Sequence, residues 1–276
     1  MMPELQLTKW QLVRDGDVIT TPHARLWPVR LPDGSAAMLK VSTETEERNG
    51  HRLLRWWDGD GAVRLLAHDH EAVLLERAQP GGSLRAMSIA GQDAQATALL
   101  CTAAERLHRP RGAVPAGLVP LQDWFQALLQ PGVALSPLLE QCRSLATAVL
   151  ATQIQVRPLH GDLHHDNVLD GGARGWLAID PKRLLGDRAF DYTVLFCNPD
   201  LCGPDIHVAT QPAIFDRRVD QVSALAGLER TRLLRWIAAS AGLSAVWFLE
   251  DGCNADVDLA VAATAMALRQ LARTGG

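Results

Sequence analysis

Residues 159–169 constrain the fold of this chain more strongly than any other feature. They read Leu-His-Gly-Asp-Leu-His-His-Asp-Asn-Val-Leu, so two short apolar segments enclose a polar stretch. Asp162 and Asn167 stand five residues apart within that stretch. A further carboxylate, Asp180, follows the apolar run at 176–179. The pattern predicts a polar loop held between two short strands, with a second acidic position after the next strand.

The spacing of these side chains indicates phosphoryl transfer from a nucleotide. This reaction needs one carboxylate at the acceptor hydroxyl, and an Asn and a second carboxylate on magnesium. Protein kinases carry the set as H-R-D-x-x-x-x-N followed by D-F-G. Asp162 and Asn167 keep this spacing, with Gly161 where the Arg would stand. We predict that Asp162 orients the hydroxyl and accepts its proton. Asn167 and Asp180 would offer Mg²⁺ the oxygen ligands that it prefers.

Three histidines around the same loop leave a different chemistry open. His160, His164 and His165 could hold zinc, and the protein would then be a metal-dependent hydrolase. Zinc sites usually take their ligands from separate elements and surround them with further hydrogen bonds. We therefore favour a structural role for His160, beneath the loop and hydrogen-bonded to the backbone.

The chain divides into a strand-rich part and a helical part. Residues 1–79 contain short apolar strands, one of them expected at 10–14, and a helix expected at 43–57. Pro32-Asp33-Gly34 is a turn that favours a hairpin. After Pro80-Gly81-Gly82 the apolar residues recur at helical period through 80–276. We predict an α+β fold of two lobes, a small antiparallel sheet with one helix and a larger mainly helical lobe, with a ligand cleft between them.

Lys40 is one of three lysines in the chain and stands midway through an apolar strand expected at 36–41. A kinase uses a compact ammonium at such a position to hold the phosphates of the nucleotide. The helix that follows should supply a carboxylate to hold this lysine, and we select Glu47, with Glu46 and Glu44 as the alternatives. A nucleotide-binding protein without catalysis would be expected to lose Lys40 or the catalytic carboxylates, and none of them is lost.

The chain has no glycine-rich phosphate-binding motif. Residues 14–23 lie between the first two expected strands and contain a single Gly. Neither G-x-G-x-x-G nor G-x-x-x-x-G-K-[ST] occurs, which excludes a P-loop enzyme at the level of motifs. Residues 74–78, at the boundary between the two parts, occupy the position of a hinge. We predict that the backbone around Glu76 and Ala78 pairs with the adenine edge of ATP.

Charge and composition limit which binding partners and which cellular compartment we expect. The net charge of −4 gives no reason to expect nucleic acid, which selects basic surfaces. The first 10 residues lack an apolar run behind a basic cluster, so we expect no signal peptide. No stretch reaches the roughly 20 apolar residues of a membrane helix. The five Cys are irregularly spaced, which predicts reduced, buried thiols in a cytoplasmic protein. No obligate protein partner is indicated.

On these residues the chain resembles the aminoglycoside phosphotransferases, and most closely the streptomycin 6-phosphotransferase branch that is grouped with hydroxyurea kinases. The resemblance extends from the Trp10 region to the C-terminal helices. The segment at 159–169 is specific for the kinase-like superfamily. Trp-Asp-Gly-Asp-Gly at 57–61 and Gly-Trp-Leu-Ala-Ile-Asp-Pro at 175–181 are more specific for the streptomycin-kinase branch. Further matching segments are Ala-Met-Leu-Lys-Val at 37–41 and Leu-Ser-Ala-Val-Trp-Phe at 243–248.

The resemblance implies a protein-kinase-like fold and a transfer of phosphate from ATP, with Mg²⁺, to a hydroxyl of an aminoglycoside. The acceptor that it implies is streptomycin, a cationic antibiotic, modified at its 6-position so as to confer resistance. Another small hydroxylated compound, such as hydroxyurea, is the alternative. It implies Lys40 and Glu47 as the ion pair at the phosphates. It also implies Asp162 as the catalytic base, with Asn167 and Asp180 as the magnesium ligands.

The acceptor site is inferred from the chemistry of the expected acceptor, because the helical segments that form this site vary within the family. Streptomycin-like molecules carry guanidinium groups, which carboxylates bind bidentately. We expect about two carboxylates of the helical part to line the pocket and most to be solvated. Trp247 stacks on a cation or packs in the core, and the core is favoured. Asp191 faces the substrate or braces the catalytic loop, and the brace is favoured. Asp187 is also a candidate cap of the helix that follows it. The acidic candidates are Asp187, Asp191, Asp200, Asp205, Glu250, Asp251, Asp256 and Asp258.

Overall fold

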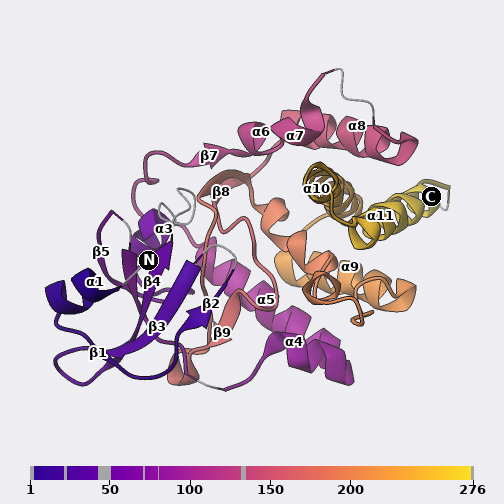
Figure 1. Ribbon diagram of the computed structural model, residues 1–276. Coiled ribbons are helices and arrows are strands. Elements are labelled where there is room, and N and C mark those ends of the chain that lie inside the picture. Colours follow the sequence, from indigo (N-terminus) through magenta and orange to yellow (C-terminus); the bar gives the residue numbers. More distant parts are fainter. Residues whose placement is uncertain are drawn as a thin grey trace.

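A sheet and a set of helices follow one another along the chain and lie side by side (Figure 1). The computed structural model describes residues 3–21, 24–42, 51–70, 72–79, 81–131 and 135–274. The sheet occupies the indigo end of the ribbon, and helices in magenta, orange and yellow form the larger part. This is the α+β arrangement of two lobes that the sequence predicts.

The N-terminal sheet contains six strands, all paired antiparallel, in the order β1-β3-β4-β6-β5, with β2 also paired to β3. The turn at 32–34 joins β3 to β4, where Arg30 pairs with Ala36, so the predicted hairpin is confirmed. The strands are β1 (Val13–Arg14), β2 (Ile19–Thr20), β3 (Ala24–Arg30), β4 (Ala36–Ser42), β5 (Leu65–His68) and β6 (Ala72–Glu76).

Strand β4 presents different residues to the two faces of the sheet, because successive side chains of a strand point in opposite directions. Ala37, Leu39 and Val41 belong to one buried apolar cluster on the outer face. Met38 and Lys40 lie on the opposite face, toward the helical lobe. The alternation therefore turns the strand lysine toward the junction of the two lobes.

The N-terminal segment differs from the prediction of a strand at 10–14. Helix α1 (Glu4–Lys9) comes first, and only Val13–Arg14 is extended. Leu7 and Trp10 are three residues apart, so a helical turn places both on one side, and both pack against the outer cluster of the sheet. Burial of these two side chains on the sheet favours the helix over a longer strand.

Helix α3 (His51–Trp57) packs between the sheet and the helical lobe. Leu53, Leu54 and Trp57 are buried, as the predicted apolar face requires. Residues 43–50, which form the start of the predicted helix, lie outside the described residues.

Helix α10 (Arg230–Glu250) is the core helix of the larger lobe. It packs against α8 (Pro137–Ala151), α9 (Pro212–Ala226) and α11 (Asp256–Thr274). By length and composition alone α10 could cross a membrane, contrary to the expectation that no stretch is long enough. Its apolar window is 61% buried inside the protein, which explains the composition, because the core helix of a large lobe is apolar over most of its surface.

The other helices of this lobe are shorter or lie near its junction with the sheet. Helix α5 follows a π-helical turn at Ser88–Gln92, and the 3-10 turns are Gly172–Arg174, Arg188–Tyr192, Val194–Phe196 and Asp200–Cys202. The helices are α4 (Leu84–Met87), α5 (Asp93–Leu107), α6 (Leu121–Trp124) and α7 (Gln126–Leu129).

Short strands within the helical lobe hold the polar segments that the sequence singles out. Strands β8 (Val156–Leu159) and β9 (Val168–Asp170) enclose residues 160–167, so the predicted loop between two strands is confirmed. Strand β9 pairs antiparallel with β10 (Trp176–Ala178), which brings Asp180 beside the loop. The remaining strands are β7 (Val119–Pro120) and β11 (Leu184–Asp187), and β11 pairs with β7 and β8.

The five cysteines are free thiols. Cys101, Cys142 and Cys197 are buried, as predicted, whereas Cys202 is half-buried and Cys253 is exposed. Burial raises the pKa of Cys101 and of Cys142 to about 12, so both stay protonated at neutral pH.

Candidate active site

The loop between β8 and β9 brings Asp162 and Asn167 together. Nδ2 of Asn167 donates hydrogen bonds to the backbone oxygen of Asp162 at 2.8 Å and to its Oδ2 at 3.1 Å. Because the amide nitrogen is committed to Asp162, the Oδ1 oxygen of Asn167 is turned to the other side. Within the described part of the chain, that oxygen has no hydrogen-bond donor.

Gly161 explains why the loop departs from the kinase motif. Its φ of +83° lies in the left-handed region that favours glycine. A Cβ at this position would lie 2.7 Å from Cδ1 of Leu184, on strand β11. An arginine here would adopt a strained backbone conformation and would force the Leu184 side chain to shift.

Asp191 holds the loop from beneath. Its Oδ1 accepts a hydrogen bond from the Gly161 amide at 2.7 Å, and its Oδ2 accepts one from the His160 amide at 2.9 Å. Nε2 of His108 lies 2.7 Å from the same Oδ2. Burial raises the pKa of this carboxyl, but the hydrogen bond from His108 and the charges around it outweigh burial and lower the pKa. Asp191, which is only 1% exposed, therefore braces the loop, which is the favoured interpretation.

The three histidines of the loop do not gather into a metal centre. His160 is fully buried, donates from Nε2 to the oxygen of Ile179 at 2.7 Å, and accepts from the Asp162 amide at 3.2 Å on Nδ1. Burial lowers the pKa of His165 to about 3. Among the residues that the structure describes, no group of three His, Cys, Asp or Glu could hold a metal ion. The zinc-hydrolase alternative therefore has no site in the described ranges.

Lys40 and Asp180 join the two lobes. Nζ of Lys40, a residue only 5% exposed, lies 2.8 Å from Oδ1 of Asp180. In the ranges that the structure describes, Oδ2 of Asp180 makes no hydrogen bond or ion pair. Glu47, which we expected to hold Lys40, lies outside the described residues, as do the alternatives Glu44 and Glu46. Their pairing stays a prediction.

Glu76 is committed to neighbouring side chains and backbone. Its Oε2 accepts a hydrogen bond from the Arg64 amide at 2.9 Å and forms an ion pair with Arg174. Burial raises the pKa of Glu76, but the Arg174 guanidinium and the Arg64 amide outweigh burial and lower it. Its side chain thus ties the end of β6 to the turn after β9.

Ala78 lies at a hollow between the lobes. Met38 from the sheet and Leu169 from β9 line the same hollow, which has a volume of about 470 Å³. The chain around it is fixed across the junction, because the Gln79 amide donates to the oxygen of Asp170 at 3.0 Å. A flat apolar ring fits between residues of this kind.

A much larger cavity, of about 720 Å³, lies against the catalytic loop. Asp162 and His164 line one side of it, and Trp247 and Asp251, at the end of α10, line another. Trp247 is half-buried and meets Trp124 edge to face, with ring centroids 5.2 Å apart. Of the predicted acceptor residues, the structure therefore brings Trp247 and Asp251 to the same cavity as Asp162.

Asp187 and Asp200 are buried and bind other groups of the protein instead. They are only 1% and 4% exposed, and neither lines the cavity. Asp187 accepts hydrogen bonds from the amides of Ile154 and Ala189, both at 3.0 Å, and pairs with Arg232. Asp200 accepts from the amides of residues 208–210 at 2.8–3.1 Å. We therefore assign both carboxylates structural roles in place of the predicted acceptor binding.

The remaining acidic candidates are also away from the cavity wall. Glu250, Asp205 and Asp256 are exposed, and Asp258 is fully buried. None of them lines the cavity.

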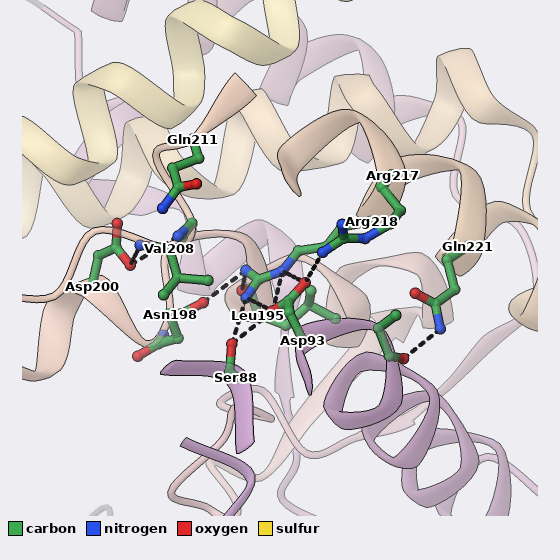
Figure 2. A network of polar contacts seen from close by, with 12 residues as sticks. Ser88, Asp93, Leu195, Asn198, Asp200, Val208, Gln211, Arg217, Arg218 and Gln221 are labelled. Carbon is green, nitrogen blue, oxygen red and sulfur yellow. Dashed lines mark hydrogen bonds and ion pairs between the residues drawn. The ribbon is translucent and has the colours of Figure 1, made fainter. Parts of the chain in front are cut away.

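A buried ion pair that the sequence did not predict fixes the wall of the cavity (Figure 2). Arg218, fully buried on α9, donates from Nη2 to Oδ1 of Asp93 at 2.6 Å. Its Nη1 donates to the backbone oxygens of Leu195 and Asn198, both at 2.7 Å. Asn198 lines the cavity, so the pair anchors the segment that forms this wall. No sequence signal could have linked two residues that are 125 positions apart.

Fold and site together define the class of protein. A strand lysine paired with the carboxylate after β10, a loop that joins Asp162 to Asn167, and a large cavity beside that loop form the arrangement of a kinase-like phosphotransferase. The chain belongs to the aminoglycoside/hydroxyurea antibiotic resistance kinases, whose family model matches residues 9–252.

Named relatives agree with this membership. The chain is 48% identical over 269 residues to a streptomycin 3''-kinase of Klebsiella pneumoniae, covering 95% of this chain and 99% of that one. It is 35% identical over 261 residues to a streptomycin 6-kinase of Streptomyces griseus, covering 90% and 82%. The solved structure of aminoglycoside phosphotransferase APH(3'')-Id of Streptomyces rimosus, in complex with ADP and streptomycin, matches with a TM-score of 0.57 at 20% identity, covering 88% and 99%. The predicted family and the kinase-like fold are thus confirmed.

Proposed function

We propose that the protein transfers the γ-phosphoryl group of ATP to a hydroxyl of streptomycin. One observation carries the proposal: Asp162, held by Asn167, forms part of the wall of a cavity of about 720 Å³. A cavity of this volume takes a drug-sized ligand. The family match and the 48% identity to a streptomycin 3''-kinase support streptomycin as that ligand.

In the proposed reaction Asp162 orients the acceptor hydroxyl and accepts its proton. Asn167 donates to Oδ2 of Asp162, which leaves Oδ1 for the hydroxyl. Nε2 of His164 lies 3.7 Å from this Oδ1, so His164 is near the oxygen that would face the hydroxyl. Both residues line the large cavity, where the acceptor would enter.

The proposed groups for the phosphates include Lys40 and Asp180, which line a small cleft separate from the large cavity. Lys40 would hold the phosphates, as a compact ammonium does on such a strand. The free Oδ1 of Asn167 and Oδ2 of Asp180 fit Mg²⁺, which is usually bound by one or two carboxylates together with substrate phosphates. When bound, the ion neutralises charge on the phosphate oxygens.

The hollow at Ala78 is the proposed site of the adenine ring. Met38 and Leu169 would enclose the ring from the two lobes, and the backbone at 76–79 would meet its polar edge. We accordingly propose residues 1–79 as the nucleotide-binding lobe and 80–276 as the catalytic and acceptor-binding lobe, in a cytoplasmic enzyme. Glu76 contributes to this site through its backbone, because its side chain is bound to Arg174.

The position of the modified hydroxyl is proposed from the relatives. The sequence-based prediction was the 6-hydroxyl. The identity to the 3''-kinase, 48%, is well above the 35% identity to the 6-kinase, and the alignment covers nearly all of both chains. We therefore propose the 3''-hydroxyl.

Hydroxyurea is the second candidate, because it stands in the name of the family. It is a molecule of five heavy atoms and would leave most of the 720 Å³ cavity unfilled. Since binding energy grows with the ligand surface that is buried, the cavity favours the larger antibiotic.

The experiment is a substrate screen with purified protein, ATP and Mg²⁺. ADP release is measured with streptomycin, with hydroxyurea and with an aminoglycoside of another class, and the phosphorylated position is found by phosphorus–proton NMR of the product. We expect release with streptomycin and phosphate on the 3''-oxygen. Phosphate on the 6-oxygen would restore the original prediction, and no streptomycin-dependent release would refute the proposed function. Expression in a sensitive bacterium tests resistance, with the D162A variant as control.

A further inference from the structure

Lys182 stands between the two halves of the site. It follows Asp180 and Pro181 on the segment between β10 and β11. With Lys40 and Asp180 it lines the small cleft at the lobe junction, and with Asp162 it lines the 720 Å³ cavity. Within the ranges that the structure describes, it is the only residue common to both linings.

The backbone around Lys182 is held in place. Its amide donates to the oxygen of His160, at the start of the catalytic loop, at 2.7 Å. Asp180 and Arg183, on either side, have φ angles of 57° and 60°, which residues other than glycine rarely adopt. Such conformations persist where the surroundings impose them, and they gather at functional sites. The segment therefore presents the lysine at a defined place beside Asp162.

The ammonium group of Lys182 is near Asp162 without being bound tightly to it. Nζ lies 3.9 Å from Oδ2 of Asp162, whereas Lys40 and Asp180 are 2.8 Å apart. Both partners are 31% exposed, and a loose pair at such exposure contributes little to stability. The pair alone does not account for a lysine at this place.

The positive charge of Lys182 indicates which kind of ligand it would contact. The proposed acceptor is a cation, so an ammonium in the wall of its cavity works against acceptor binding. The same ammonium favours an anion that approaches from the nucleotide side. The anion that must lie between the two cavities during the reaction is the phosphoryl group in transfer.

We propose that Lys182 is a further catalytic residue, which donates hydrogen bonds to the oxygens of the γ-phosphoryl group during transfer. This rests on the proposed function. The bond from the acceptor oxygen to phosphorus forms while the bond from phosphorus to the bridging oxygen breaks, and that electron pair leaves with ADP. The hydroxyl proton passes to Asp162, and Lys182 keeps its protons throughout.

The first test compares Lys182→Met with Lys9→Met, since Lys9 is half-exposed on α1, lines neither the small cleft nor the 720 Å³ cavity, and lies 3.2 Å from the half-buried carboxylate of Asp69. For Lys182→Met we expect kcat to fall about 100-fold or more, the usual effect of removing one donor to developing charge. The KM values for ATP and streptomycin should stay within about threefold, because the contact forms only in transfer. Lys182→Arg should recover part of the rate, and Lys9→Met should behave as the parent protein. A kcat of Lys182→Met within about threefold of the parent value would overturn the proposal.

The second test separates contact with phosphate from mere orientation of Asp162. ADP with aluminium fluoride imitates the phosphoryl group in transfer, and its affinity is measured by calorimetry for the parent protein and for Lys182→Met. We expect Lys182→Met to weaken this complex about 100-fold and to leave ADP alone unchanged. Equal affinities for the fluoride complex would show that Lys182 only positions Asp162 and would refute the proposal.

Failure of the two proposals can be told apart. If streptomycin drives no ADP release in the parent protein, the proposed function fails, and the fluoride complex, formed without acceptor, decides on Lys182. If the parent protein is active and Lys182→Met is equally active, only the Lys182 proposal fails. An unchanged thermal midpoint shows that the variants fold.

Discussion

Two sets of charged residues in this protein are built in opposite ways. At Asp93 and Arg218 the charges are buried, the contacts are as short as 2.6 Å, and the guanidinium is surrounded by acceptors from the chain itself. At Asp162 the carboxylate is 31% exposed, Lys182 and His164 stand 3.9 and 3.7 Å away, and a cavity opens beside it. The first set is closed, and the second has room for ligand atoms.

Burial and contact distance distinguish structural charges from chemical ones in this fold. A buried pair that loses one member leaves a charge without a partner, so its removal is costly to stability. A half-exposed group that faces a cavity costs little to remove, and its loss is felt in the reaction instead. Variants of the two sets should therefore separate into those that unfold and those that fold but do not turn over.

The largest effect is expected for Asp162→Ala. Loss of the proposed base should lower kcat by roughly 10²–10⁴-fold, the usual contribution of a positioned acid or base. ADP affinity and the thermal midpoint should stay near the parent values, because the side chain is 31% exposed and faces the cavity. Steady-state kinetics with streptomycin and calorimetry with ADP check this, and near-normal turnover would contradict the proposed mechanism.

The closed set is tested by Arg218→Met, with Arg217→Met as its matched control. Arg218 is fully buried against Asp93, so its loss should lower the free energy of unfolding by about 3–5 kcal/mol. Arg217 contacts the same carboxylate at 3.2 Å but is 49% exposed, and its loss should cost less than about 1 kcal/mol. Urea unfolding measures both values. Equal losses in the two variants would remove the distinction between closed and open sets.

Acid should weaken the fold through two buried carboxylates, Asp93 of the closed set and Asp191 beneath the catalytic loop. The pKa of each is lowered in the folded protein from an ordinary value of 3.8. Each carboxylate therefore stabilises the fold fully above that value, and the contribution is lost as the pH falls from there toward the folded pKa. Asp191→Asn should lower stability at pH 7 by about 1–3 kcal/mol, since a buried acceptor for two loop amides is weakened. Between pH 4 and pH 2 the free energy of unfolding of this variant should fall less than that of the parent protein.

The smallest effect is expected at the rim of the open set. Asp251 lines the cavity and its neighbour Glu250 does not, which makes them a matched pair. Asp251→Asn should raise the KM for streptomycin roughly tenfold, the value of one hydrogen bond to a charged group, with little change in kcat. Glu250→Gln should leave both constants unchanged. An equal effect of the two substitutions would place the cationic part of the acceptor elsewhere.

Local patterns account for what could be predicted from the sequence. Asp162, Asn167 and Asp180 are found because their spacing along the chain is set by a loop between short strands, and those strands are present. The hairpin at 32–34 is found because a tight turn has its own residue chemistry. Lys40 is found because an alternating strand turns it to the inner face.

Long-range partners account for what could not be predicted. Asp187 resembles an acceptor ligand in the sequence, yet it pairs with Arg232, 45 residues further on. A helix forms at 4–9, and of the strand expected at 10–14 only residues 13–14 are extended, because Leu7 and Trp10 pack against the outer face of the sheet. Neither contact leaves a trace in the local pattern of residues.

The reaction class follows from the sequence alone, because phosphoryl transfer needs a few side chains at short, fixed spacings. The tertiary structure shows which carboxylates face the cavity and which are enclosed, since the role of a carboxylate depends on the donors and the solvent around it. It also placed Lys182 between the two halves of the site. In the sequence that residue is one lysine among three, and its neighbours come together only when β10, β11 and the catalytic loop fold against one another.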